Sequence, residues 1–109
     1  MTIENLQENL IEDFSFFEDW TQKYEYMIEL SKTLDKMDDS LKNDENLIKG
    51  CQSKVWLNAD YIDGKINFKA DSEAIITKGI IAILLIVFNN KTPDEIKNSE
   101  VSFIEKIGI

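Results

Sequence analysis

The sequence contains no histidine, no arginine and only one cysteine, Cys51, among its 109 residues. Without histidine, neither a Ser-His-Asp triad nor a Cys-His pair can form within this chain, which excludes the corresponding hydrolases. A single cysteine cannot make an internal disulfide, and without histidine it cannot complete a zinc site of thiolate and imidazole ligands. An iron–sulfur cluster held by this chain alone would also lack ligands.

Basic residues are scarce as well, because the chain carries 12 lysines against 21 acidic residues, for a net charge of −9. Nucleic-acid binding needs cations along the phosphate backbone, with arginine favoured for reading bases, so nucleic acid is excluded as a partner. We interpret the acidity as a source of colloidal solubility and not as a dedicated acidic face. Adjacent acidic pairs such as Asp38-Asp39 are common by chance at this composition, and we interpret them as solvated surface, not as a magnesium site.

Long apolar runs and targeting signals are also missing. The longest uninterrupted apolar run, Ile80 to Phe88, is far shorter than the roughly 20 residues that span a bilayer. Residues 1–10 include acidic side chains and no basic region, which is not typical of a secretory signal. No glycine-rich phosphate loop is present. We therefore expect a soluble, cytoplasmic protein with no membrane partner, whose thiol stays reduced.

The N-terminal third has helical periodicity. Apolar residues from Ile3 to Phe14 keep the spacing of one helix face, and the capping-box pair Ser15 and Glu18 predicts that a second helix begins there. The buried stripe of this second helix is predicted to comprise Trp20, Tyr24, Met27, Ile28 and Leu34. Residues 35–45 are polar and acidic and predict a loop.

The period then changes to that of strands. Alternation over residues 54–58 and 65–69, separated by the hairpin signal Asp63-Gly64, predicts two antiparallel strands. Residues 46–49 can supply a third strand, which would place Gly50-Cys51 at a connection between strands.

The C-terminal half is predicted to be helical again. A helix over residues 73–88 is apolar nearly all round from residue 80, so it should be the central buried one, and Gly79 within it indicates a close approach of another backbone. The candidate caps are Asp71 or Ser72 for this helix, Thr92 followed by Pro93 for a short helix, and Ser99 for a helix over about residues 100–107. The order of elements predicts one α+β domain over residues 1–109, with a small antiparallel sheet packed against helices.

Cys51 is the candidate for chemistry. A free cysteine is commonly buried and inert, and composition alone favours that interpretation. The setting favours another, because Gly50 precedes Cys51 and polar Gln52-Ser53 follow it, between two apolar segments. Glycine allows a sharp backbone turn or the close approach of another protein. Nearby Lys49 and Lys54 would lower the pKa of the thiol.

These residues resemble the signature of the SufE family of sulfur acceptors. The resemblance rests first on residues 50–57, GCQSKVWL, with Asn46 upstream. Further matches, in the family's order and spacing from about residue 14 onward, are Asp19-Trp20, Lys23-Tyr24, Ile28-Glu29-Leu30, Gly64, Phe68, Ala70-Asp71-Ser72, Lys78-Gly79, Ala82 and Thr92-Pro93. Glu73 stands where the family usually has aspartate. Family members also continue beyond the position of Ile109 with a Pro-Ser-Arg segment and a last helix, so we expect a domain truncated at its C-terminus.

The resemblance implies a SufE/IscU-like fold and a sulfur carrier that is not itself an enzyme. In this family, a SufS-like pyridoxal-phosphate cysteine desulfurase holds sulfur as a persulfide. Cys51 would accept that sulfur, stimulate the desulfurase and deliver sulfur to a SufBCD-type scaffold for iron–sulfur cluster assembly. Gly50, Gln52, Ser53 and Asp71 would bind the partner or support the loop. No cofactor or metal is expected on the chain itself.

Two other functions stay open on the sequence. The chain could regulate a desulfurase without covalent chemistry, with Cys51 incidental. It could also be a one-cysteine thiol peroxidase, which has the least support because no arginine is available to activate the thiolate.

Overall fold

The computed structural model describes residues 2–50, 53–100 and 102–107. Its elements in chain order are α1 (Ile3–Ser15), α2 (Trp20–Ser31), the 3₁₀ helix η1 (Asp39–Leu41), β1 (Val55–Ile62), β2 (Lys65–Ser72), α3 (Ile75–Phe88), α4 (Pro93–Lys97) and α5 (Phe103–Ile107). Helices combined with an antiparallel β1–β2 sheet make an α+β fold, so the predicted fold class is confirmed.

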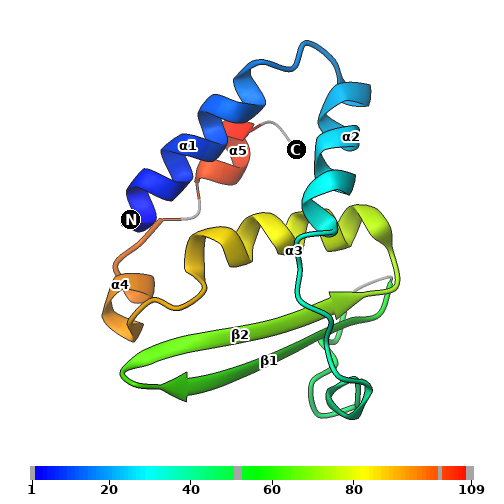
Figure 1. Cartoon of the computed structure of the whole chain (residues 1–109), viewed down its shortest axis with the longest axis vertical. Helices are drawn as coiled ribbons and strands as arrows, with labels where there is room; N and C mark the ends of the chain where they lie inside the picture. Colours follow the sequence, from blue (N-terminus) through cyan, green and yellow to red (C-terminus); the bar gives the residue numbers. More distant parts are fainter. Residues whose placement is uncertain (1, 51–52, 101, 108–109) are drawn as a thin grey trace.

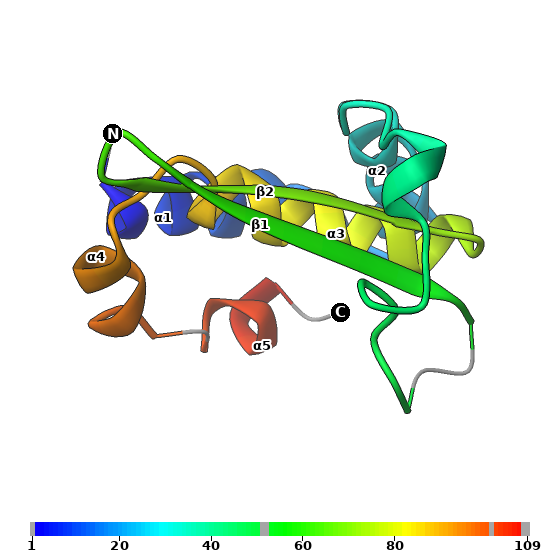
Figure 2. The same cartoon turned by 90° about the horizontal axis from the view of Figure 1, so that it is seen from below.

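Helix α3 lies at the centre of the molecule. The β1–β2 hairpin runs along one side of it, and α1, α2 and α5 lie on the other side (Figure 1). In the view from below, α4 and α5 lie to one side of both the hairpin and α3 (Figure 2). Ala82, Ile83 and Val87 of α3 are fully buried, which confirms the prediction that this helix is the central one.

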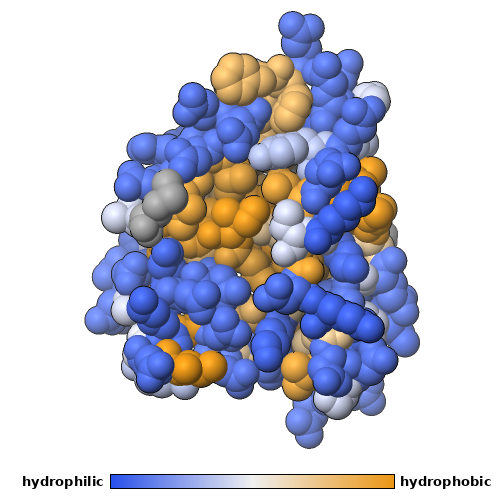
Figure 3. All heavy atoms as spheres, viewed as in Figure 1, coloured by the Kyte–Doolittle hydropathy of each residue, from blue (hydrophilic) through white to orange (hydrophobic). Residues whose placement is uncertain are grey.

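The main core fills the space that α1, α2, α3 and α5 surround. Figure 3 shows apolar side chains gathered there, with hydrophilic side chains around them. The buried members of this cluster are Ile3, Leu10, Phe14, Met27, Leu30, Ala82, Ile83, Val87, Phe103 and Ile107. Among the residues that the structure describes, no helix is both long enough and apolar enough to cross a membrane.

A short break at residues 16–19 separates α1 from α2. Ser15 is the last residue of α1, and the N-cap of α2 is Asp19, whose carboxylate accepts a hydrogen bond from the Gln22 N–H at 2.9 Å. The predicted capping box at Ser15 and Glu18 is therefore wrong. Asp19 caps as well as serine does, and its later position lets the chain turn between the two helices.

Of the predicted buried stripe of α2, only Met27 is fully buried, because Ile28 and Leu34 are partly exposed and Leu34 lies beyond the end of the helix. Met27 is 1% exposed, whereas Trp20 is 52% exposed and Tyr24 is 44% exposed. The first turns of α2 lie away from α3, and its last turns lie close to it (Figure 1). Trp20 and Tyr24 instead lie against each other, with ring centroids 5.6 Å apart.

The hairpin follows the sequence prediction closely. Its strands pair antiparallel from Val55 opposite Ser72 to Ile62 opposite Lys65. Asp63 and Gly64 form the turn with φ values of 52° and 80°, the left-handed conformation that a tight two-residue hairpin requires. Residues 46–49 do not form a third strand in the described sheet, because their pairing with β1 is limited to one bridge before the chain turns away.

Helix α3 begins at Ile75, later than predicted. Its N-cap, Ala74, supplies no side-chain hydrogen bond, and both predicted caps, Asp71 and Ser72, still belong to β2. The Asp71 carboxylate binds two lysines, as described below, and the Ser72 hydroxyl oxygen accepts from the Ala74 N–H at 3.2 Å, one residue before the helix begins. The backbone of α2 approaches Gly79 closely, as predicted, because a Cβ at this position would lie 2.7 Å from the Met27 carbonyl oxygen.

Of the two short C-terminal helices, α4 begins as predicted and α5 does not. Thr92 caps α4 in a reciprocal capping box with Glu95, and Pro93 occupies the first turn, as predicted. Helix α5 begins at Phe103 instead of near residue 100. Ser99 does not cap it, because its hydroxyl donates back to the Ile96 carbonyl at 2.6 Å.

Candidate functional site

The connection between Ile48 and Val55 contains four of the five predicted site residues. Cys51 and Gln52 lie outside the described residues. Gly50 is exposed with a φ of 91°, a backbone conformation that strains any residue with a side chain. Ser53 is half-buried on the other side of the connection. The structure therefore defines the two ends between which Cys51 lies in the sequence.

Both ends of this connection are attached to the hairpin. The Ile48 N–H donates to the Val55 carbonyl at 2.9 Å, and the Leu57 N–H donates to the Asn46 carbonyl at 2.9 Å. The Asn46 side-chain amide also donates to the Leu41 carbonyl at 2.8 Å, which ties this segment to η1. Residues 46–48 thus extend the sheet briefly along the free edge of β1.

A second attachment holds the other end at Lys54. Its carbonyl accepts two hydrogen bonds, one from the Ser72 hydroxyl at 2.9 Å and one from the Glu73 N–H at 3.2 Å. Ser72 is 7% exposed, so these bonds are largely protected from water. The chain therefore re-enters β1 at a fixed point beside the start of α3.

Asp71 is the fifth predicted residue, and it is the centre of an ion-pair cluster. Its carboxylate accepts from the ammonium groups of Lys42, at 2.8 Å, and Lys78, at 3.2 Å. The Ser72 N–H adds a third hydrogen bond at 2.8 Å. The Asp71 side chain is only 13% exposed. It thereby joins the end of β2 to η1 on one side and to the first turn of α3 on the other.

The pKa values of this cluster follow from its contacts. Burial raises the pKa of the Asp71 carboxyl, but the hydrogen bonds from Lys42, the Ser72 N–H and Lys78 together hold that pKa below its ordinary value. The hydrogen bond to Asp71 raises the pKa of Lys42 above its ordinary value. The ion-pair cluster therefore holds one carboxylate between two ammonium groups at neutral pH.

The sequence analysis did not identify Lys42 and Trp56 as parts of this ion-pair cluster. Trp56 lies on β1 directly opposite Asp71, and the Lys42 ammonium is 5.8 Å from the centroid of its ring. Trp56 and Asp71 were both within the matched motifs, and antiparallel pairing could have placed them together. No local signal pointed to Lys42, which lies in the acidic loop predicted over residues 35–45.

An apolar groove of about 350 Å³ opens beside the ends of the same connection. It lies between the hairpin, α3 and α4, and its lining residues are Ile48, Val55, Leu57, Phe68, Ala70, Ile81, Leu84, Leu85, Phe88, Ile96 and Ser99. Ile48 and Val55, the two residues that bound the connection, both belong to this lining. Among the described residues that line the groove, Ser99 is the one that bears a hydroxyl group.

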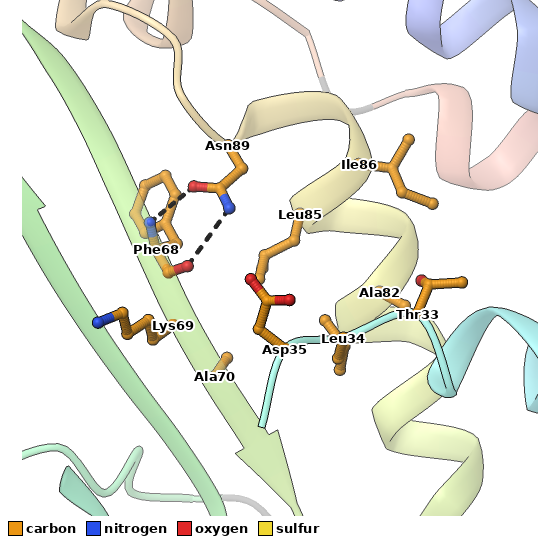
Figure 4. Close-up of a pocket in the computed structure, with 10 residues that line it drawn as sticks. All are labelled: Thr33, Leu34, Asp35, Phe68, Lys69, Ala70, Ala82, Leu85, Ile86 and Asn89. Atoms are coloured by element: carbon orange, nitrogen blue, oxygen red, sulfur yellow. Dashed lines mark hydrogen bonds between the residues drawn. The ribbon is translucent and has the colours of Figure 1, made fainter. Parts of the chain in front are cut away.

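A smaller cavity of about 160 Å³ lies between β2, α3 and the segment after α2 (Figure 4). At its end, the Asn89 side chain accepts from the Phe68 N–H at 2.7 Å and donates to the Phe68 carbonyl at 3.4 Å. Asn89 thus substitutes for a neighbouring strand at this edge of β2. Of the predicted site residues, the three that the structure describes, Gly50, Ser53 and Asp71, do not line this cavity.

Within the described ranges, no three histidine, cysteine, aspartate or glutamate side chains lie together as a metal site would require.

Comparison with known proteins gives a consistent result. Residues 8–109 match the family model of SufE, described as an Fe-S metabolism associated domain. The chain is also 36% identical to an uncharacterised SufE-like protein of Rhizobium meliloti, in an alignment that covers 94% of this chain and 76% of the relative.

Proposed function

This chain belongs to the SufE family, and on that basis we propose that it accepts persulfide sulfur on Cys51 from a SufS-like cysteine desulfurase. The family places the chain in iron–sulfur metabolism. The proposal adds that Cys51 stimulates the desulfurase by removing its sulfur, and that the sulfur then passes to a SufBCD-type assembly scaffold. The observation that carries it is the position of the only cysteine, within GCQSKVWL, on a connection whose two ends are attached to the hairpin.

The transfer step conserves atoms and electrons. The Cys51 thiolate attacks the outer sulfur of the desulfurase persulfide, and a new S–S bond forms on Cys51. The S–S bond within the desulfurase persulfide breaks, and its electron pair leaves with the desulfurase cysteine as a thiolate, which is then free for another cycle. This is a thiol–disulfide type of exchange, so its rate depends on the thiolate fraction of Cys51 and on access to it.

Support comes from the described ends of the connection. Hydrogen bonds at Ile48, Leu57 and Lys54 fix where the chain leaves the hairpin and where it returns. A short connection with fixed ends can present its central residue at a defined place to a partner. We propose that Gly50, Gln52 and Ser53 let this segment fit the partner and that Asp71 supports its base.

The apolar groove suggests where the Cys51 side chain rests between transfers. Ile48 and Val55, the residues that bound the connection, both line the groove, so apolar surface begins at each of its ends. We propose that Cys51 turns toward this surface in the free protein, where a carried persulfide would be shielded from reductants. Binding of the desulfurase would favour an outward position only through a higher affinity for that state.

Replacement of Cys51 by serine tests the covalent function. We expect the Cys51→Ser variant to fold normally but to lose stimulation of the desulfurase, since serine cannot accept the sulfur. Mass spectrometry of the native protein after incubation with desulfurase and cysteine should show an adduct of about +32 Da, one sulfur atom, that the variant lacks. If the serine variant stimulates turnover as well as the native protein does, non-covalent regulation replaces this proposal.

A further inference from the structure

We infer that Lys42 is a positioning residue for the proposed sulfur transfer, acting through Asp71 and Trp56 on the segment that leads to Cys51. The predicted effect of Lys42 on sulfur transfer rests on the proposed function. The positioning of the segment by Lys42 rests only on contacts among the described residues.

The contacts of Lys42 connect two parts of the chain that are distant in sequence. Lys42 directly follows η1 as its C-cap, and its ammonium lies 2.8 Å from Asp71 on β2 and 5.8 Å from the centroid of the Trp56 ring on β1. Its side chain is 25% exposed and that of Asp71 is 13% exposed, so water screens this pair less than it screens a surface pair. Lys42 therefore holds η1 against both strands of the hairpin.

The segment after Lys42 leads directly to the connection. The Asn46 side chain donates to the Leu41 carbonyl, so residues 41–46, which include Lys42, form a closed turn. Asn46 and Ile48 then make the hydrogen bonds to Leu57 and Val55 that attach this end to β1. If Lys42 no longer held the turn, the pairing along β1 would lose its support, and the point at which the chain leaves the hairpin would vary.

Lys78 provides a matched comparison for this role. It binds the same carboxylate at 3.2 Å, but it lies in the first turn of α3, on the opposite side from η1. Loss of either lysine leaves Asp71 with one ammonium partner, so neither change leaves the carboxylate without a cation. The two variants remove the same charge from the same cluster, and only one of them releases the turn at residues 41–46.

The experiment compares Lys42→Met, Lys78→Met and Lys42→Arg in the full 109-residue chain. For Lys42→Met we expect the turnover rate of persulfide transfer from the desulfurase to fall on the order of tenfold, because misplacement of reacting groups slows a reaction strongly. The KM for the desulfurase should change less than the turnover rate, since Lys42 acts on the placement of the segment and is not itself proposed to contact the partner. Lys78→Met should transfer at the native rate, and Lys42→Arg should restore most of the rate, since arginine keeps the charge and the reach.

Amide hydrogen exchange provides a readout that does not depend on sulfur transfer. The N–H groups of Ile48 and Leu57 should exchange faster in Lys42→Met than in Lys78→Met, because these groups form the pairing along β1. If the native chain accepts no sulfur, the proposed function fails, and the exchange result alone decides whether Lys42 positions this segment. Equal exchange in the two methionine variants, or equal slowing of transfer by both, would overturn the inference in favour of a general charge effect.

Discussion

Asp71 carries one negative charge between two ammonium groups, and this arrangement makes a pH-dependent contribution to stability. The hydrogen bonds that Asp71 accepts lower its pKa in the folded protein despite burial. A carboxyl group with a lowered folded pKa stabilises the fold above its unfolded pKa of about 4, and this stabilisation is lost as the pH falls through the folded pKa. We therefore expect Asp71→Asn to lower the urea midpoint at pH 7, and this deficit to shrink as the pH falls below about 4.

The measurement is urea unfolding of the native chain and of Asp71→Asn from pH 7 downward. Asp38 also has a lowered pKa, because its carboxylate accepts from the Ser40 N–H, but it is present in both proteins and its effect cancels in the difference. Exposed Asp44→Asn serves as the control. A deficit for Asp71→Asn that stays constant down to the lowest pH would mean that its ionic bonds do not stabilise the fold.

Individual residues show where sequence reasoning succeeded and where it could not. Gly79 was assigned to a close contact because glycine in a helix interior needs such a reason, and the Met27 carbonyl provides it. Helical spacing predicts a buried Trp20, but Trp20 is the first residue of α2 and is 52% exposed. Lys42 was missed because its partners, Asp71 and Trp56, are brought to it only by the tertiary fold.

The residue at which each helix begins depends on which groups the nearby polar side chains bind. Ser15, Ser72 and Ser99 are all good N-cap residues by type, and none of them caps the predicted helix. Ser72 instead donates its hydroxyl to the Lys54 carbonyl, which holds the base of the connection. The sequence pattern identified the α+β order and the hairpin with its turn because hydrophobic period and turn residues act locally. It could not show which tertiary acceptor each serine would find.

Helix α3 has one fully buried face and one face that borders the apolar groove. Ile83 is 0% exposed, so Ile83→Ala should lower the free energy of unfolding by about 2–5 kcal/mol. Leu84 lies within the same stretch predicted to be buried, but it is only partly buried and lines the groove, so Leu84→Ala should cost less. Urea unfolding followed by circular dichroism compares the two variants. A larger loss for Leu84→Ala would mean that α3 is rotated from the orientation described.

At the scale of the whole molecule, the hairpin, α3 and α4 together form the groove beside the ends of the connection. Together they provide an apolar surface that includes Ile48 and Val55, the two residues that bound the connection. A thiol that rested there would be protected in the free protein and still be attached to a segment that a partner can reach. The rate at which Cys51 reacts with a thiol reagent reports on this arrangement.

Ser99 allows the groove to be filled without changing the connection itself. If the Cys51 side chain rests in the groove, the free protein should react with a thiol reagent more slowly than a small thiol does, and a persulfide-blocked desulfurase should accelerate the reaction. Ser99→Leu adds an apolar side chain to the lining and should expel the thiol, so labelling should become faster in the free protein. Ser99→Ala also loses the hydroxyl bond to Ile96 but leaves the groove open, so it should label like the native chain. Labelling of native Cys51 at the rate of an unhindered thiol would show that the side chain does not rest against this surface and that transfer needs no outward movement.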